Sequence, residues 1–371
     1  SRFPQHISPQ QPFVSIREIA HEVSDRTWAR VTFSGDVFEM EDQRNWTDAS
    51  FKTYSTPLAW PAPVRISEGT PIQQSVRLTL EGDVRQRPRH TPATDMRLAI
   101  GSLLGRTLPP VGMGAGAEPH ALDDASLAAL RALRLSHLRV VPDGHTEPIA
   151  YLSAAARTAI ALGCPLELAV SLRHVTEPRL AQYASTLSAT GCAIARWLLL
   201  CDDLARDDAA KRIQHLRPRL DDIAPGAPIG SGTDHYFTEF NRTPPPVQDA
   251  DFVSYTLNPQ VHAFDDLSLM ETLPMQAETV TNASRLAGGL PVAISPISLR
   301  PRTNAHRAAE GGAPALSADP RQTALFGAAW TLGSLAMLAG HPSLASLTYY
   351  ELAGPAGVLQ LPDRDMGTGL E

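Results

Sequence analysis

The sequence has few of the features that mark several common protein classes. Only three cysteines occur in 371 residues, Cys164, Cys192 and Cys201, and no two of them form a CxxC pair. This odd, scattered set predicts buried thiols in a reducing compartment rather than a disulfide framework. No apolar run reaches the roughly 18 residues that a membrane span needs, and residues 1–13 lack the order of a signal peptide. We therefore expect a cytoplasmic protein with no membrane partner.

Excess positive charge and familiar catalytic motifs are also missing. The formal net charge is −7 and no dense run of lysine and arginine occurs, so we expect no nucleic-acid partner. The sequence contains no HExxH, no cysteine cluster and no GxSxG. These absences disfavour the common hydrolytic metal sites and the serine hydrolases, and we predict neither a metal nor a cofactor. The sequence makes no prediction about the oligomeric state.

What is present points first to a β-rich segment. Hydrophobic residues make up 43% of the chain, enough for a large core and two domains. Between residues 15 and 80, short β-like runs alternate with turn residues: "ARVTFSGDVFEME", "PAPVRIS" and "QQSVRLTLEG". We predict that residues 1–92 comprise the C-terminal part of a β-sandwich domain begun upstream, together with a linker.

Residues 93–371 have a different pattern. Apolar strands alternate with Ala/Leu-rich segments of helical period, which is typical of a parallel sheet covered on both faces. Eight such units predict an α/β fold, a (β/α)₈ TIM-like barrel, with a Rossmann-like open sheet as the weaker alternative. The glycine cluster "GMGAG" is interpreted as a loop. The predicted strands are "MRLAIGS", "HLRVV", "LELAVSL", "ARWLLLC", "APIGSGTDHYFTEFN", "DFVSYTLNP", "PVAISPISL" and "SLTYYELAG".

Candidate site residues lie where these strands end, because the active site of such a barrel is at the carboxyl ends of its strands. Glu239 and Glu351 each follow an aromatic strand, where apolar walls raise a carboxyl pKa into the range that suits proton transfer. His262 is a third candidate catalytic group. Each carboxylate also has a structural interpretation, as a helix cap or an arginine partner. The predicted substrate-binding residues are Arg173, Asp203, Asn241, Arg300 and Asn304.

Three stretches of the sequence, "HISPQQPF", "FEMEDQRNWTDASFKTY" and "PQVHAFDDLSLMET", resemble the D-apionate lactonase (D-apionolactonase) family of bacterial apiose catabolism. The resemblance extends from about Phe3 to Gly354. It implies hydrolysis of a branched sugar-acid lactone, D-apionolactone, to D-apionate, and a longer protein at the amino end. The partner it implies is a small sugar lactone.

Lactone hydrolysis needs a base for water, a donor for the oxyanion and an acid for the departing alkoxide. We assign the base and acid roles to Glu239 and Glu351 in either order, with His262 as an oxyanion donor or an alternative base. Strand seven, "AISPISLRPRTN", has no carboxylate, which disfavours a retaining glycosidase. Two alternatives stay open, a glycoside hydrolase-like enzyme acting on a plant saccharide and a carbohydrate-binding barrel without catalysis.

The run "FEMEDQRNWTDASFKTY" concentrates charges and aromatics in a way that is costly to bury unless each charge has a partner. We expect it to contact the barrel, with Asp42, Arg44 and Asn45 in a buried polar network and Trp46 packed beneath. Two interpretations remain. Either the network only locks the fold, or Trp46 and Arg44 close over the substrate.

Overall fold

The computed structural model describes residues 3–83, 99–116, 122–202, 204–302, 319–354 and 356–359. The chain forms two compact units. The first comprises residues 1–43 and 50–106, and the second comprises residues 44–49 and 107–371. The short segment 44–49 therefore belongs to the second unit although its neighbours in sequence belong to the first.

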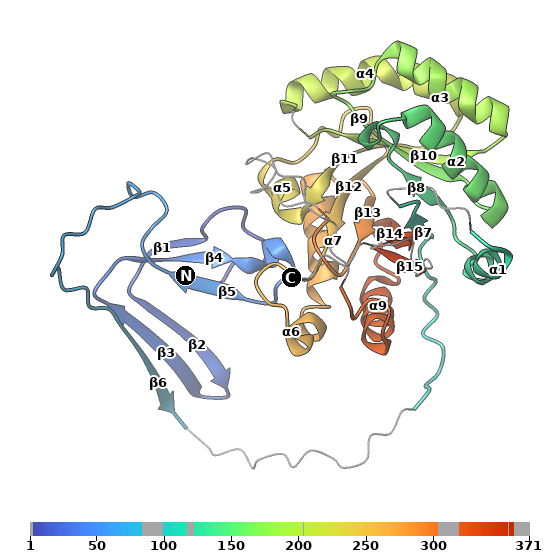
Figure 1. Cartoon of the computed structure of the whole chain (residues 1–371). Coiled ribbons are helices and arrows are strands. Elements are labelled where there is room, and N and C mark those ends of the chain that lie inside the picture. The colour runs from blue at the N-terminus through green and yellow to red at the C-terminus, as the bar shows by residue number, and fades with distance from the viewer. Residues whose placement is uncertain are drawn as a thin grey trace, which may run out of the picture. The chain divides into compact units, whose positions relative to one another are not determined.

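The first unit contains two antiparallel sheets of three strands (Figure 1). In one, β4 (Phe38–Asp42) pairs with β1 (Phe13–Ile16) and β5 (Phe51–Tyr54), and Ile16, Phe38 and Met40 form its buried core. In the other, β3 (Thr27–Ser34) lies between β2 (Glu18–Ser24) and β6 (Ser75–Gly82). The β-rich prediction is confirmed for the runs that became β3, β4 and β6.

The predicted strand "PAPVRIS" is wrong, since residues 61–67 form no strand. Pro61 and Pro63 lack the N–H groups that a sheet ladder requires, and this outweighs the alternating pattern around them.

The second unit is a closed barrel of eight parallel strands (Figure 1). Each strand pairs with the next along the chain, and β14 pairs with both β13 and β7 and so closes the ring. The prediction of a (β/α)₈ barrel is confirmed, and closure rules out the open Rossmann-like sheet. The strands are β7 (Val111–Gly114), β8 (Leu138–Val140), β9 (Leu166–Ser171), β10 (Ile194–Leu200), β11 (Ile229–Tyr236), β12 (Phe252–Leu257), β13 (Val292–Ile297) and β14 (Leu344–Ala353), and β15 (Gly357–Leu359) adds to β14.

The first barrel strand is not where the sequence pattern placed it. The predicted strand "MRLAIGS" covers residues 96–102, of which the described residues 99–102 form no strand. Its place is taken by β7, which contains most of the glycine cluster interpreted as a loop. Glycine is depleted in strands because it has no side chain to pack. In β7 that lack of a side chain leaves room for neighbouring groups inside the barrel.

Helices flank the strands. The predicted strand "APIGSGTDHYFTEFN" is wrong in its last five residues, which belong to the helix Phe237–Arg242. Several ends carry ordinary caps: the side chains of Asp123 and Thr176 accept from backbone N–H groups, and Gly163 and Gly191 are left-handed C-caps. The helices are α1 (Asp124–Ala132), α2 (Pro148–Leu162), α3 (Glu177–Thr190), α4 (Arg206–Ile223), α5 (Phe237–Arg242), α6 (Asp266–Glu271), α7 (Met275–Leu286) and α9 (Leu325–Leu338), with short 3₁₀ turns η1 (Gln43–Trp46) and η2 (Pro142–Gly144).

In the described part of the chain, no helix is long and apolar enough to cross a membrane. The expectation that the last twenty residues make a poor barrel helix falls mostly on residues 360–371, which lie outside the described residues.

Candidate active site

Glu351 occupies a space that a glycine provides. It lies in β14 opposite Gly114 of β7. A Cβ at Gly114 would be 3.4 Å from the Glu351 Cγ and 3.0 Å from the Tyr350 carbonyl oxygen, so a larger residue would crowd this carboxylate. The side chain is thus placed near the carboxyl end of its strand, where barrel active sites form.

The Glu351 carboxyl is buried among charged neighbours, with only 9% of the residue exposed. Burial raises its pKa, and the nearby guanidinium groups of Arg302 and Arg139 oppose that shift without cancelling it. Among the described residues no side chain or backbone group donates a hydrogen bond to this carboxylate. A carboxyl group in these surroundings is suited to exchanging a proton with a bound ligand.

Two arginines share one carboxylate beside Glu351. Arg139 Nη2 and Arg302 Nη1 lie 2.7 and 3.1 Å from the same Asp234 oxygen, Oδ1. Burial alone would raise the pKa of Asp234, but Arg302 and Arg139 outweigh it and hold that pKa below its ordinary value. Asp234 therefore stays ionised and fixes both guanidinium groups. In this charged cluster of Glu351, Asp234, Arg139 and Arg302, the two guanidinium groups are donors suited to a ligand oxygen that gains negative charge.

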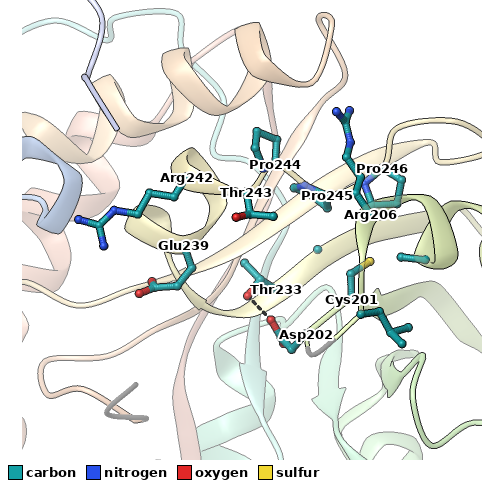
Figure 2. Close-up of a pocket in the computed structure, with 13 residues that line it drawn as sticks. Cys201, Asp202, Arg206, Thr233, Glu239, Arg242, Thr243, Pro244, Pro245 and Pro246 are labelled. Carbon is teal, nitrogen blue, oxygen red and sulfur yellow. Dashed lines mark hydrogen bonds between the residues drawn. The ribbon is translucent and has the colours of Figure 1, made fainter. Parts of the chain in front are cut away.

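Asp202 fixes the backbone that carries Asp234. Its Oδ2 accepts from the Asp234 N–H at 2.8 Å. Its Oδ1 accepts from the Thr233 hydroxyl at 2.5 Å, the bond drawn in Figure 2. Both carboxylate oxygens are used, so Asp202 acts here as a structural acceptor. It also links the charged cluster to a neighbouring pocket.

That pocket has a volume of about 270 Å³ and lies beside the ends of β10 and β11 (Figure 2). Glu351, Arg139 and Arg302 do not line it. The pocket is therefore separate from the charged cluster, to which Asp202 connects it. The lining residues are Cys201, Asp202, Leu204, Arg206, Ala209, Gly232, Thr233, Glu239, Arg242, Thr243, Pro244, Pro245 and Pro246.

Beneath the cluster a second charged group fills the barrel interior. Glu167 is fully buried, accepts from the Ser295 hydroxyl, and lies 3.7 Å from Arg139 and 3.6 Å from Arg196. His137, also fully buried, bonds the Thr348 hydroxyl at 2.8 Å. Burial lowers the pKa of His137 to about 4, so the ring is neutral at pH 7. Glu167 is therefore compensated by the two arginines, and it holds Arg139 from below while Asp234 holds it from above.

The segment 44–49 is anchored to the barrel unit by polar contacts on two barrel elements. Asn45 accepts from Asn241 Nδ2 at 2.8 Å through Oδ1 and from the Thr238 hydroxyl at 2.9 Å through its carbonyl oxygen, both on α5. The Thr47 hydroxyl donates to the Asn258 carbonyl oxygen, just after β12, at 2.9 Å. The predicted contact between this run and the barrel is confirmed for residues 44–49. Asp42 instead belongs to the first unit, where it accepts from the Ser8 N–H.

Trp46 and Asp48 of this segment both contact His262. The Trp46 ring meets the His262 ring edge to face at 5.2 Å, and the Arg242 guanidinium lies over Trp46 at 5.4 Å. Asp48 Oδ2 lies 2.6 Å from His262 Nδ1. His262, on the loop after β12, and Asp48, in segment 44–49, therefore form an aspartate–histidine pair 214 positions apart in sequence.

Comparison with known proteins identifies the chain's relatives. Residues 111–369 match the family model described as "D-apionate lactonase, TIM barrel domain", and residues 1–83 match "D-apionate lactonase, N-terminal domain". The chain belongs to the D-apionate lactonase family. It is 30% identical over 383 aligned positions to the D-apionate lactonase of Brucella anthropi, covering 96% of this chain. It spans only 61% of the length of that relative.

Solved structures to which the chain is similar include an arabinofuranosidase of Xanthomonas axonopodis pv. citri and a glucosidase of Croceicoccus marinus. Each has a TM-score of 0.46 and 12% identity. The first match covers 66% of this chain and 64% of that one, and the second covers 70% and 65%.

The predicted site residues of this D-apionate lactonase family chain fall into separate surroundings. Glu351 joins the charged cluster. Glu239 lies in α5, where its Oε2 accepts from the Tyr236 N–H at 3.2 Å, and Figure 2 shows its carboxylate directed away from Asp202. Among the described residues no hydrogen bond or ion pair joins Glu239 to Glu351.

The remaining candidates are dispersed. His262 and Asn241 both contact segment 44–49. Arg300 lies 3.5 Å from the buried Asp319 carboxylate, and Arg173 is exposed after β9. Asp203 and Asn304 lie outside the described residues. No group of three or more potential metal ligands occurs among the residues that the structure describes.

Sequence reasoning missed Arg139 and Asp234. Each could have been singled out from the sequence, because a charged residue inside a predicted buried strand requires a partner. Arg139 stands in the middle of "HLRVV" and Asp234 inside "GSGTDHY". Their pairing across β8 and β11 depends on barrel closure, which the sequence does not specify residue by residue.

Proposed function

We propose that this protein hydrolyses the ester bond of a branched sugar-acid lactone, with D-apionolactone as substrate and D-apionate as product. Family membership and the relative's name support the reaction class. The single structural observation that carries the proposal is the buried Glu351 carboxyl beside two guanidinium groups that Asp234 holds. A cytoplasmic site of action in carbohydrate catabolism is part of the same proposal.

In the proposed reaction, water adds to the lactone carbonyl carbon and the carbonyl oxygen gains negative charge. Arg302 and Arg139, held by Asp234, supply cationic donors for that oxygen. When the ring C–O bond breaks, the departing alkoxide takes a proton, and Glu351 is the donor we assign. Its raised pKa favours the protonated form that this step requires. Glu239 caps α5, and we assign it no proton transfer.

The test is acid release from a panel of aldonolactones that includes D-apionolactone, followed with a pH indicator and corrected for spontaneous opening. We expect selective turnover of the branched lactone, unchanged by a chelator. Turnover that a chelator abolishes would keep the lactonase and overturn the metal-free site.

Two further assays distinguish the alternative functions. Release of a chromophore from aryl glycosides without lactone turnover would favour a glycoside hydrolase. Saturable sugar binding without any turnover would favour a carbohydrate-binding barrel.

A further inference from the structure

We propose that His262 is the base that activates the attacking water and that Asp48 is the residue that positions it. The inference deepens the lactonase function proposed above and rests on it. It gives a mechanistic role to segment 44–49, which belongs to the barrel unit although the residues on either side of it belong to the first unit.

The first step of the argument is the geometry of the pair. Asp48 Oδ2 lies 2.6 Å from His262 Nδ1, and the Asp48 side chain is only 7% exposed. A carboxylate accepts but cannot donate, so this contact places the imidazole proton on Nδ1. The lone pair is then on Nε2. This is the tautomer in which a histidine accepts a proton from water or a hydroxyl group.

The second step is that Nε2 is available. The His262 side chain is 32% exposed, and within the described ranges its only polar contact is the one with Asp48. Trp46 contacts the ring at its edge. The ring is therefore held on one side and open on another, which is the arrangement a general base requires.

The third step is how firmly the surrounding chain holds Asp48. Thr47 has a left-handed backbone, φ +66°, which a β-branched residue adopts only where its surroundings enforce it. Its hydroxyl bond to Asn258 and the Asn45 contacts with α5 supply that enforcement. The strained residue directly precedes Asp48, and such strain concentrates at functional sites.

The fourth step is placement. His262 follows β12 and Glu351 lies in β14, and only β13 separates these strands. Neighbouring strands lie about 4.8 Å apart, so the carboxyl ends of β12 and β14 are about 10 Å apart. The position inferred for the lactone is between the side chains that extend from these two ends. The base then lies on the side of the lactone where water attacks, and the acid lies on the side where the alkoxide departs.

The proton balance closes. Nε2 takes one proton from water as the oxygen bonds to the carbonyl carbon. The ring C–O bond then breaks, and the alkoxide takes the Glu351 proton. The new carboxyl group ionises, Glu351 regains a proton, and His262 releases its own to solvent. The net change is lactone and water to carboxylate, hydroxyl and one proton.

The test uses two amides that mimic different ring nitrogens. His262→Asn places an N–H near the Nδ1 position and so keeps the bond to Asp48, but has nothing at Nε2. His262→Gln places its amide near Nε2 and loses the Asp48 bond. We expect His262→Asn to retain the wild-type melting temperature while kcat falls at least 100-fold with little change in KM. Asp265→Asn, a change at the exposed cap of α6 on the same loop, is the matched control and keeps wild-type turnover.

The outcomes separate this inference from the proposed function. If the wild-type protein hydrolyses the lactone and a folded His262→Asn protein is equally active, the base assignment is overturned and the lactonase function stands. The contact between Asp48 and His262 is then a structural one. An inactive wild-type protein overturns the lactonase, and the base assignment falls with it. Nitrogen-15 NMR of the wild-type imidazole gives an independent reading. We expect the Nδ1–H tautomer at His262 and its loss in Asp48→Asn, whereas an Nε2–H tautomer in the wild type overturns the inference directly.

Discussion

Gly112 lies directly against His137 inside the barrel. A Cβ built on Gly112 would be 2.4 Å from the His137 Nε2 and 2.5 Å from its carbonyl oxygen. Neither the backbone oxygen nor a ring bonded to Ser136 and Thr348 can move away at low cost. This contact explains the glycine at position 112 of β7.

Gly112→Ala is therefore expected to lower the free energy of unfolding by roughly 1–3 kcal/mol, the range of overpacking in a closed core. The denaturant midpoint measures it. Gly144→Ala is the matched control, because a Cβ at Gly144 meets nothing within 4 Å. Equal midpoints for the two variants would contradict the packing described for β7.

The fold was largely predictable from the sequence, and β7 shows where prediction failed. Seven of the eight barrel strands overlap strands that the sequence pattern predicted. For β7 the deciding factor is the volume of His137 and Glu351, which project from other strands. The local sequence pattern of β7 does not show how much space the side chains of other strands occupy inside the barrel.

The candidate site was predictable only in part, for a similar reason. Glu351 was found because its surroundings along the chain are aromatic. The contact between Asp48 and His262 joins residues 214 positions apart, and the sequence pointed only to a barrel contact for that run. Glu239 has a similar local context to Glu351, yet it caps a short helix.

His137 makes stability depend on pH. Burial lowers its pKa to about 4 in the folded protein, from an ordinary value of 6.5. The unfolded chain therefore binds the proton more readily, and this stabilisation is full above pH 6.5 and is lost as pH falls toward 4. The linkage is on the order of 3 kcal/mol. We expect the difference in unfolding free energy between wild type and His137→Gln to shrink over that interval, and a constant difference would contradict a neutral buried ring.

Glu351 has the opposite dependence. Its folded pKa is raised by burial, so its contribution to stability is full below the ordinary value of 4.5 and is lost as pH rises through the folded pKa. Glu351→Gln removes the ionisable group, so the unfolding free energy of the variant does not fall in this way as pH rises. Melting temperatures of variant and wild type, measured from pH 4 to pH 8, should show the variant gaining relative to wild type as pH rises. A relative decline of the variant would mean that Arg302 and Arg139 dominate over burial.

Asp234 holds two arginines, and replacing it with Asn removes the negative charge that compensates them while keeping an oxygen acceptor. We expect Asp234→Asn to lower the unfolding free energy by about 1–3 kcal/mol and to reduce turnover by misplacing the guanidinium groups. Asp83→Asn is the control, because its pair with Arg26 is exposed, at 52% and 71% of the two side chains, and contributes about 0–1 kcal/mol. Similar losses in unfolding free energy from both changes would contradict the central role of Asp234.

The most direct test of the account is NMR observation of D-apionolactone conversion to D-apionate by the intact wild-type protein and by Glu351→Gln, each corrected for spontaneous hydrolysis. We predict catalysed conversion by the wild type and a rate at least about 100-fold lower in the folded variant. A folded Glu351→Gln protein that hydrolyses the lactone at the wild-type rate would contradict the assignment of this cluster as the catalytic centre.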